Sequence, residues 1–267
     1  MLRNLVKNDI YRCFKGVKYK IIFLLIFFFV ALIYLHTAFS VIGKTSLDLL
    51  PTSRMSIILN PEYRSAIHLA VLIFPVISCL LYADSYSYEK EKTISNYYIL
   101  RVNRKKYIIS KAISIVIINF IAIYFAFGCN EIFTMIAVPS IGVANEYGLA
   151  SYEIYGKTCG LFLPEIYDNT PHLYNFIIIT IMSLYSACLG LFTLGFSLVF
   201  SQIKRLYQCI YVFLIVSIVT ILLPTKYQVT MYIQTAPGEL NSLIIALVGW
   251  LLAGSILIMI GIWKENL

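Results

Sequence analysis

The sequence predicts an all-α integral membrane protein with six transmembrane helices and a cytoplasmic amphipathic helix at its N-terminus. Of the 267 residues, 60% are hydrophobic and only 13% are charged, whereas soluble globular domains hold about 25% charged residues. Six apolar runs have about the length, ~20 residues, that spans the hydrocarbon core of a bilayer. Each run is too long and too evenly apolar for a barrel strand, whose apolar residues alternate over about ten positions.

Residues 1–20 are predicted to form a helix that lies on the cytoplasmic surface of the membrane. Its apolar residues recur at spacings of three and four, and cations suited to lipid headgroups occupy the other face. Alternatively, the basic residues of this segment serve only to keep the start of the first span on the cytoplasmic side. The apolar run that follows is longer than the core of a signal peptide and lacks a small-x-small cleavage site, so we expect it to be retained. The apolar positions are Leu2, Leu5, Val6, Ile10, Cys13, Phe14 and Val17.

Six spans follow, and both termini are predicted to be cytoplasmic. Isolated polar residues within the runs do not change this assignment, and Pro75 is expected to kink the second span. The third span could run on as far as Ala137. The longest segment between spans on the outer side is 138–172, and the cytoplasmic segment 84–106 joins the second and third spans. The predicted spans are residues 21–42, 66–83, 107–129, 173–202, 206–224 and 243–263.

The distribution of charge sets the predicted orientation. Sixteen of the 21 Lys and Arg residues fall in segments that face the cytoplasm in this topology, and five fall outside, as the positive-inside rule requires. Topology and the anionic lipids of the inner leaflet account for the net charge of +8. We therefore expect membrane lipids and no nucleic acid among the partners. The Ile-, Lys- and Tyr-rich composition is typical of an AT-rich bacterial genome, so the expected location is the bacterial plasma membrane.

The chemistry of an enzyme is missing from the sequence. The three histidines, His36, His68 and His172, are scattered and form no HExxH motif. There is no GxxxxGK[ST] loop to cradle a phosphate, so the chain is not expected to hydrolyse ATP itself. A channel filter motif is also missing. We expect no catalytic residue, no metal site and no cofactor bound by this chain.

The cysteines show no metal-ligand spacing and no CxxC motif. Most of the six lie in or beside spans, where Cys behaves as a small hydrophobe. Cys129 and Cys159 both map to the outer side and could form a disulfide there.

Two polar residues in the third span are candidates for a substrate path. An ionisable group at membrane depth is usually functional, and Glu131 lies at or near the outer end of this span. If the span ends earlier, Glu131 is an interfacial residue already in water. Asn119 lies about three turns deeper and is expected to form a hydrogen bond to a neighbouring helix.

The stretch DSYSYEKEKTISNYYILRVNRKKYIISK, residues 84–111, holds seven of the Lys and Arg residues. Residues 85–100 are predicted to form a short helix, with the charges of Glu89, Glu91 and Lys92 toward water and an aromatic, aliphatic edge on another side. The topology explains the basic residues of this stretch but not the acidic residues Glu89 and Glu91 that precede most of them. An amphipathic helix with both signs of charge is instead typical of a docking surface.

This stretch resembles a known family. The pattern Glu89-x-Glu91-Lys92-Thr93, with Leu100, Arg104, Tyr107 and Lys111 after it, is similar to the intracellular loop of type-2 ATP-binding-cassette (ABC) exporter permeases. That loop has a Glu, then Gly-Thr, a Leu-Pro-x-Ser-Arg run and a Lys that opens the next span. The order of the elements along the chain is similar as well. The sequence departs from the pattern at Lys92, Arg101 and Asn103, which stand where the family tends to have Gly, Pro and Ser.

The resemblance implies a permease subunit without its own ATPase. The helix between spans two and three would be a coupling helix that docks in a separate ABC ATPase subunit, and that subunit would bind ATP and Mg²⁺. Two permease chains, identical or different, would face each other, with the substrate path lined by spans one, two and five. The docking and coupling residues would be Glu89, Glu91, Thr93, Tyr97, Arg104 and Lys111, with Arg104 and Lys111 as anchors.

The resemblance also implies a function. We expect the chain to couple ATP hydrolysis by its partner to the export of an amphipathic or hydrophobic substrate. An antimicrobial or cytolytic peptide, exported or excluded for immunity, is one such substrate. The alternative is a membrane scaffold or sensor that transports nothing and whose charged cytoplasmic loop docks a signalling partner.

Overall fold

The structure is a computed structural model that describes residues 2–42, 56–92, 102–137, 162–234 and 238–264. The described residues form helices and no strand. Six of these helical segments are long and apolar enough to cross a membrane, which confirms the prediction of an all-helical, multi-pass membrane protein. They are α2 (Val17–Val41), α4 (Arg64–Ser78) with its extension η2 (Cys79–Ala83), α7 (Arg104–Ala137), α9 (Pro171–Val199), α10 (Arg205–Leu222) and α12 (Leu240–Lys264).

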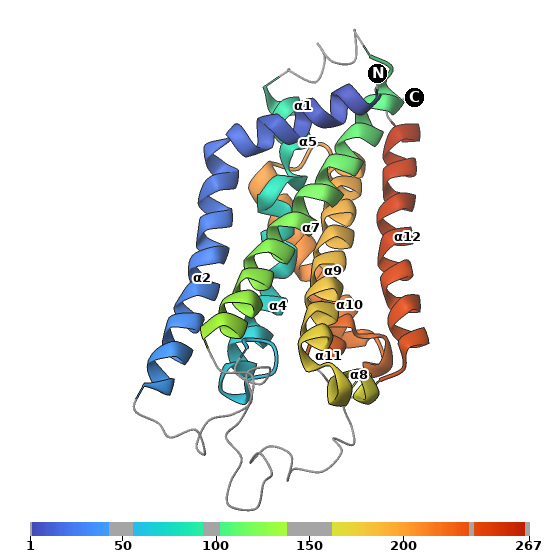
Figure 1. Ribbon diagram of the computed structural model, residues 1–267. Coiled ribbons are helices and arrows are strands. Elements are labelled where there is room, and N and C mark those ends of the chain that lie inside the picture. Colours follow the sequence, from blue (N-terminus) through green and yellow to red (C-terminus); the bar gives the residue numbers. More distant parts are fainter. Residues whose placement is uncertain (1, 43–55, 93–101, 138–161, 235–237, 265–267) are drawn as a thin grey trace, which may run out of the picture.

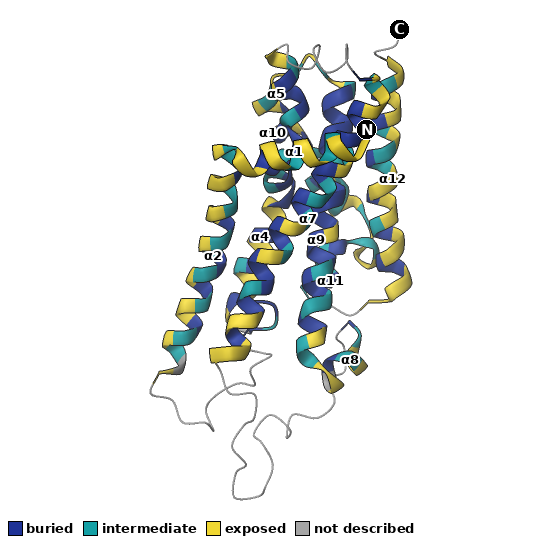
Figure 2. Cartoon of the chain, turned by 45° about the horizontal axis from the view of Figure 1, so that its top comes forward, coloured by how far each residue is buried: buried dark blue, intermediate teal, exposed yellow. Residues whose placement is uncertain are grey.

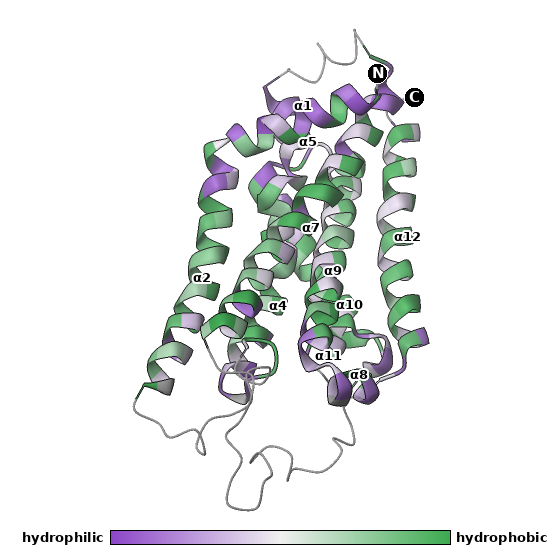
Figure 3. Ribbon diagram, in the orientation of Figure 1, coloured by the Kyte–Doolittle hydropathy of each residue, from purple (hydrophilic) through white to green (hydrophobic). Residues whose placement is uncertain are grey.

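The spans run side by side, and α1 (Leu2–Lys15) lies across one end of the bundle (Figure 1). We call this end the N-terminal face. The opposite end, the far face, holds the short helices α8 (Pro164–Asn169) and α11 (Val229–Ile233) together with η1 (Pro61–Tyr63) and η3 (Thr225–Tyr227). Hydrophilic residues gather on α1 and at the far face, and hydrophobic residues cover the spans between them (Figure 3). This banding is what a bilayer-spanning bundle requires.

A sharp elbow separates α1 from the first span. Gly16 has an extended backbone, and its N–H donates to the carbonyls of Arg12 and Cys13 at 3.0 and 2.9 Å. A Cβ atom at Gly16 would lie 3.1 Å from the Cys13 carbonyl oxygen, so glycine suits this close approach. The single helix predicted for residues 1–20 is therefore two helices, and the first span begins at Val17.

The second span changes its helical geometry near the N-terminal face. The α-helix continues through Pro75 to Ser78 and becomes a π-helix over Cys79–Ala83. There the Asp84 N–H donates to the Cys79 carbonyl at 3.2 Å, a five-residue step in place of the usual four. The short helix α5 (Ser85–Glu91) follows at once. The rest of the helix predicted for residues 85–100 lies outside the described residues.

The fourth span, α9, is the centre of the bundle (Figure 2). In the most apolar 18-residue part of α9, 83% of the residues are buried, whereas the corresponding shares are 22% for α2 and 17% for α12. Helix α12 packs closely on α9 because glycines remove side chains from the contact. A Cβ atom at Gly195 would lie 2.6 Å from Leu257 Cβ and 2.9 Å from the Gly254 carbonyl oxygen. Gly249 has nothing within 4 Å of its Cβ position, so it takes no part in this interface.

Candidate functional site: a buried charge network beneath the N-terminal helix

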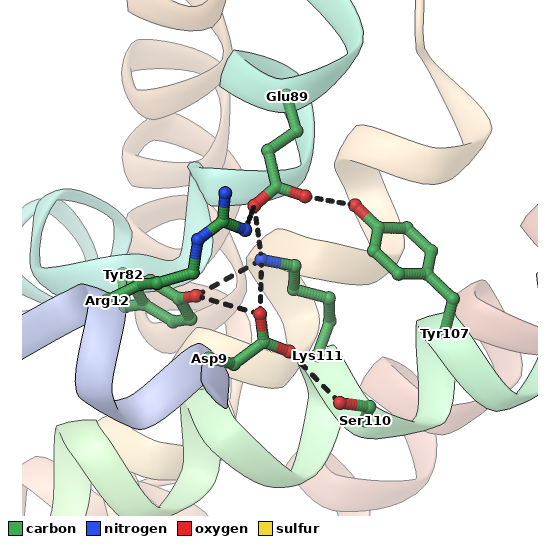
Figure 4. A network of polar contacts seen from close by, with 7 residues as sticks. All are labelled: Asp9, Arg12, Tyr82, Glu89, Tyr107, Ser110 and Lys111. Atoms are coloured by element: carbon green, nitrogen blue, oxygen red, sulfur yellow. Dashed lines mark hydrogen bonds and ion pairs between the residues drawn. The ribbon is translucent and has the colours of Figure 1, made fainter. Parts of the chain in front are cut away.

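A network of polar side chains joins α1, η2, α5 and α7 beneath the N-terminal face (Figure 4). At its centre, Lys111 Nζ lies 2.7 Å from Glu89 Oε1 and 3.0 Å from Asp9 Oδ1. The same ammonium donates to the Tyr82 hydroxyl at 3.1 Å. Lys111 is 0% exposed and Glu89 is 6% exposed. Two carboxylates from two other segments therefore neutralise one lysine that has no access to water.

Further side chains complete the coordination of both carboxylates. The Tyr107 hydroxyl donates to Glu89 Oε2, and Arg12 Nη1 lies 3.5 Å from Glu89 Oε1. The Ser110 hydroxyl donates to Asp9 Oδ2 at 3.0 Å. Each carboxylate thus has an ion-pair partner and a hydroxyl donor, which is the condition for burying a charge at tolerable cost.

Helical spacing brings these side chains to one place. Tyr107, Ser110 and Lys111 stand at i, i+3 and i+4 of α7, so they share one face of that helix. Asp9 and Arg12 stand three apart on α1 and point to the same side. The network then follows from the crossing of α1 over α7 next to α5.

The network balances its charges. It holds two acids, Asp9 and Glu89, and two bases, Arg12 and Lys111. Removing Lys111 would leave Asp9 buried without an ion-pair partner, which costs about 3–5 kcal/mol. The crossing of α1 over α7 and the position of α5 are therefore strongly coupled.

A second group of charges fixes α5 to the first and fifth spans. Asp84, the buried residue that precedes α5, pairs with Lys18 of α2 and with Arg205 of α10, whose Nε lies 3.3 Å from Asp84 Oδ2. The guanidinium of Arg205 also lies over the ring of Tyr88, 5.4 Å from its centroid. Within α5, the Ser87 hydroxyl donates to Gln208 Oε1 of α10 at 2.6 Å. Together with the network around Lys111, these contacts join Asp84 and α5 to α1, α2, α7 and α10.

The predicted docking residues fall into different environments. Glu89 is buried inside the network, so the prediction that its charge points to water is wrong. Glu91 and Lys92 are exposed, as predicted, and Glu91 Oε1 accepts from the Arg205 N–H at 3.4 Å. Lys111 is buried against Glu89. Arg104 is partly exposed at the start of α7, while Thr93 and Tyr97 lie outside the described residues.

Several members of the network do not follow from the sequence pattern. Asp9 is the only acid in a basic helix, and it was a visible signal, because an acid on the buried side of an amphipathic helix needs a cation. The polar triad of Tyr107, Ser110 and Lys111 at the start of an apolar span was a second signal. Tyr82, which contacts both Lys111 and Asp9, carries no signal of its own, because only the folded bundle brings it near them.

The described cysteines include an unexpected disulfide. Cys79 of η2 and Cys209 of α10 are bonded, with their Cα atoms 6.0 Å apart. The bond joins the second and fifth spans close to Asp84 and Arg205. The predicted bridge between Cys129 and Cys159 stays a prediction, because Cys159 lies outside the described residues.

A second polar cluster surrounds Glu131 toward the far face. Glu131 is 1% exposed, so it is a buried residue and the interfacial alternative does not hold. His172 Nδ1 lies 2.7 Å from Glu131 Oε1, and the Asn175 amide donates to both carboxylate oxygens at 3.0 Å. The same amide donates to Ser56 Oγ at 3.1 Å. The cluster fastens the segment before the second span to the third and fourth spans.

Asn119 is buried in the middle of the bundle, but its contact differs from the prediction. Its amide donates to the Ile115 carbonyl of its own helix at 3.0 Å, and the predicted bond to a neighbouring helix is not formed by this amide. The side chain fits against Gly190 of α9, where a Cβ atom would lie 2.6 Å from Asn119 Nδ2. Asn119 therefore contributes to the packing of α7 on α9.

A cavity of about 370 Å³ opens between α4 and α10, with α9 and α11 at its sides. Apolar side chains such as Val71, Leu72 and Val216 line it together with polar ones such as Gln228. His68 and Gln234 also line it and are hydrogen-bonded to each other. The cavity can thus receive a ligand with both apolar and polar parts.

Comparison of the chain with protein-family models, with curated proteins and with solved structures finds no match. Among the described residues, no group of three His, Cys, Asp or Glu side chains is placed to hold a metal ion.

Proposed function

We propose that this chain is the permease subunit of an ATP-driven exporter of the type-2 ABC class. In this proposal both termini are cytoplasmic, the membrane is the bacterial plasma membrane, and a separate ATPase subunit binds ATP and Mg²⁺. One observation carries the proposal: the short helix after the second span, α5, and Asp84 directly before it are bound by ion pairs and hydrogen bonds to the first, third and fifth spans and to α1. A helix held in this way transmits displacement.

The geometry gives a route for that displacement. A push on α5 moves Glu89 and Asp84 together, because α5 is a rigid seven-residue helix that begins directly after Asp84. Glu89 acts on α1 and α7, and Asp84 acts on α2 and α10. Binding of ATP by the partner would then favour one of two packed arrangements of the spans, as in other rigid-body transitions.

The proposal divides the charged stretch into two roles. Glu91 and Lys92 are exposed and would contact the ATPase, together with Thr93 and Tyr97. Glu89 and Lys111 would be positioning residues that join α5 to the spans. Burial lowers the pKa of Lys90, and the nearby charge of Arg104 lowers it further.

The cavity between α4 and α10 supports the substrate class. Its mixed lining suits an amphipathic or hydrophobic substrate, such as an antimicrobial or cytolytic peptide. The spans that border it are the second and fifth. Only 22% of the most apolar part of α2 and of α10 is buried, and a second permease chain and lipid would cover the remaining surface in the assembled exporter.

Purification of the chain from its native membrane tests the proposal. We expect an ATPase subunit to co-purify, and its ATP hydrolysis to rise when a transported amphipathic peptide is added. Glu91→Lys should reduce that stimulation, while Lys264→Glu at the end of the last span should not. Recovery of an intact permease dimer without any ATPase, or with a signalling protein in its place, would contradict the proposal and support the scaffold alternative.

A further inference from the structure

A crevice of about 450 Å³ opens at the elbow between α1 and α2. It is bounded by the end of α1 and the start of α2 on one side, and by α5 and the first residue of α10 on the other. The crevice is separate from the cavity between α4 and α10, which lies toward the far face. Two members of the network around Lys111, Arg12 and Tyr82, form part of its lining.

The crevice carries an excess of positive charge. Arg12, Lys18 and Arg205 line it from three different helices, and Asp84 is the only acid in its lining. The three cationic side chains are 42%, 39% and 38% exposed, whereas the side chain of Asp84 is 6% exposed. The cations therefore face the opening and the acid lies at its floor, an arrangement that favours an anionic ligand.

A buried hydroxyl adds a donor to the same wall. Ser85 lines the crevice, and its Oγ is buried without a hydrogen-bond partner among the described residues. Buried hydroxyls are normally hydrogen-bonded, so this one is explained by a ligand that accepts from it. Phosphate oxygens accept such bonds and also form ion pairs with Arg and Lys.

The surroundings distinguish a lipid from a soluble phosphate. Val17 forms the edge of the crevice and is 70% exposed. Below it, the first span continues with the exposed apolar residues Ile21, Leu24 and Phe28. A molecule whose phosphate lies in the crevice would have its acyl chains along this face, with favourable burial of apolar surface.

We propose that the crevice binds the phosphate headgroup of an anionic phospholipid such as phosphatidylglycerol. The ligand joins the elbow of the N-terminal helix to α5 and α10 from the membrane side. This site depends on insertion of the chain in a bilayer and not on the proposed transport function.

The test is lipid binding to the full purified chain, measured by native mass spectrometry during titration with phosphatidylglycerol or phosphatidylcholine. We expect tighter binding of phosphatidylglycerol. Arg205→Gln should weaken it about fivefold, the effect of one lost cation near a lipid surface, while Lys204→Gln, an adjacent exposed lysine, should change it far less. Equal binding of both lipids, or equal effects of the two substitutions, would overturn the proposal.

Two further measurements distinguish loss of the site from misfolding, and binding of a lipid phosphate from binding of inorganic phosphate. Ser85→Ala removes a hydroxyl that has no hydrogen-bond partner in the described parts of the chain, so it should leave the thermal stability of the lipid-free chain unchanged and weaken phosphatidylglycerol binding about tenfold. Unchanged binding by this variant counts against the site. Inorganic phosphate should not displace the lipid, and displacement at millimolar phosphate would show that the site takes a soluble anion instead.

Discussion

Lys111 of the third span and Glu89 of the short helix after the second span form an ion pair with a separation of 2.7 Å, and neither side chain faces water. Asp9 joins them from the N-terminal helix. Three segments that are far apart in the sequence thus meet at one ammonium group, and four predictions follow from this and the related contacts.

Replacing Lys111 by Met is expected to destabilise the fold by about 3–5 kcal/mol, because Asp9 would be left buried without a cation and Glu89 would keep only Arg12. Denaturant unfolding of the purified chain in detergent measures the change. Lys106→Met is the matched control, since Lys106 is an exposed lysine of the same helix, five residues before Lys111. The double variant Glu89→Leu/Lys111→Met should recover part of the loss. Equal stability of Lys111→Met and the control would show that the pair is not formed.

Gly195→Ala is expected to destabilise the contact of α9 with α12 by about 1–3 kcal/mol, because the added methyl group would meet Leu257 and the backbone of Gly254. Gly249→Ala is the control, since nothing lies within 4 Å of its Cβ position. The melting temperatures of the two variants measure the difference, and Gly195→Ala should melt at the lower temperature. If Gly249→Ala is the more damaging change, the packing described for these helices is incorrect.

Cys13 is expected to resist alkylation at neutral pH. Burial raises the pKa of its thiol from 9.0 to about 12, so the reactive thiolate is disfavoured. An unfolded chain loses the proton near pH 9 and the folded one near pH 12. The thiol's contribution to the docking of α1 is therefore fully present below pH 9 and is lost as the pH rises through 12.

Maleimide labelling as a function of pH measures this. A cysteine placed at exposed Asn8 in a Cys13→Ser background should react readily at pH 7. Equal labelling rates for Cys13 and this control would show that α1 does not rest on the bundle.

Cysteines introduced at Lys106 and Asn169, both exposed and at opposite ends of the bundle, are expected to differ in access. An impermeant maleimide added to intact cells should label Asn169→Cys and should reach Lys106→Cys only after the membrane is opened. The physical reason is the positive-inside distribution of Lys and Arg. The reverse pattern would place the termini outside and would remove the basis for a cytoplasmic ATPase contact.

The sequence predicted the spans well because a bilayer imposes a length and a polarity that composition reveals directly. The third span extends to Ala137, the limit that hydropathy allowed. The elbow at Gly16 was missed, since the apolar periodicity continues through it, and glycine is needed there for a close backbone approach that only the fold reveals.

The candidate site was only partly predictable. The motif identified Glu89 and Lys111, but the charge of Glu89 was assigned to water because amphipathic periodicity in a short helix does not show what covers it. The actual cover is Asp9, Arg12 and the helix that carries them. Likewise, Cys79 and Cys209 have ordinary positions in apolar spans, and only the packing of α4 and η2 beside α10 brings them together.

The π-helical turn at Cys79–Ala83 determines how far α5 is rotated relative to α4. Each residue of an α-helix turns the chain by about 100°, so the additional residue in this turn rotates α5 by that amount relative to α4. With this rotation Glu89 faces inward and Tyr88 and Glu91 face outward. Deletion of a single residue from the turn would restore a regular helix and swing the Glu89 carboxylate away from Lys111, although every charged side chain would still be present.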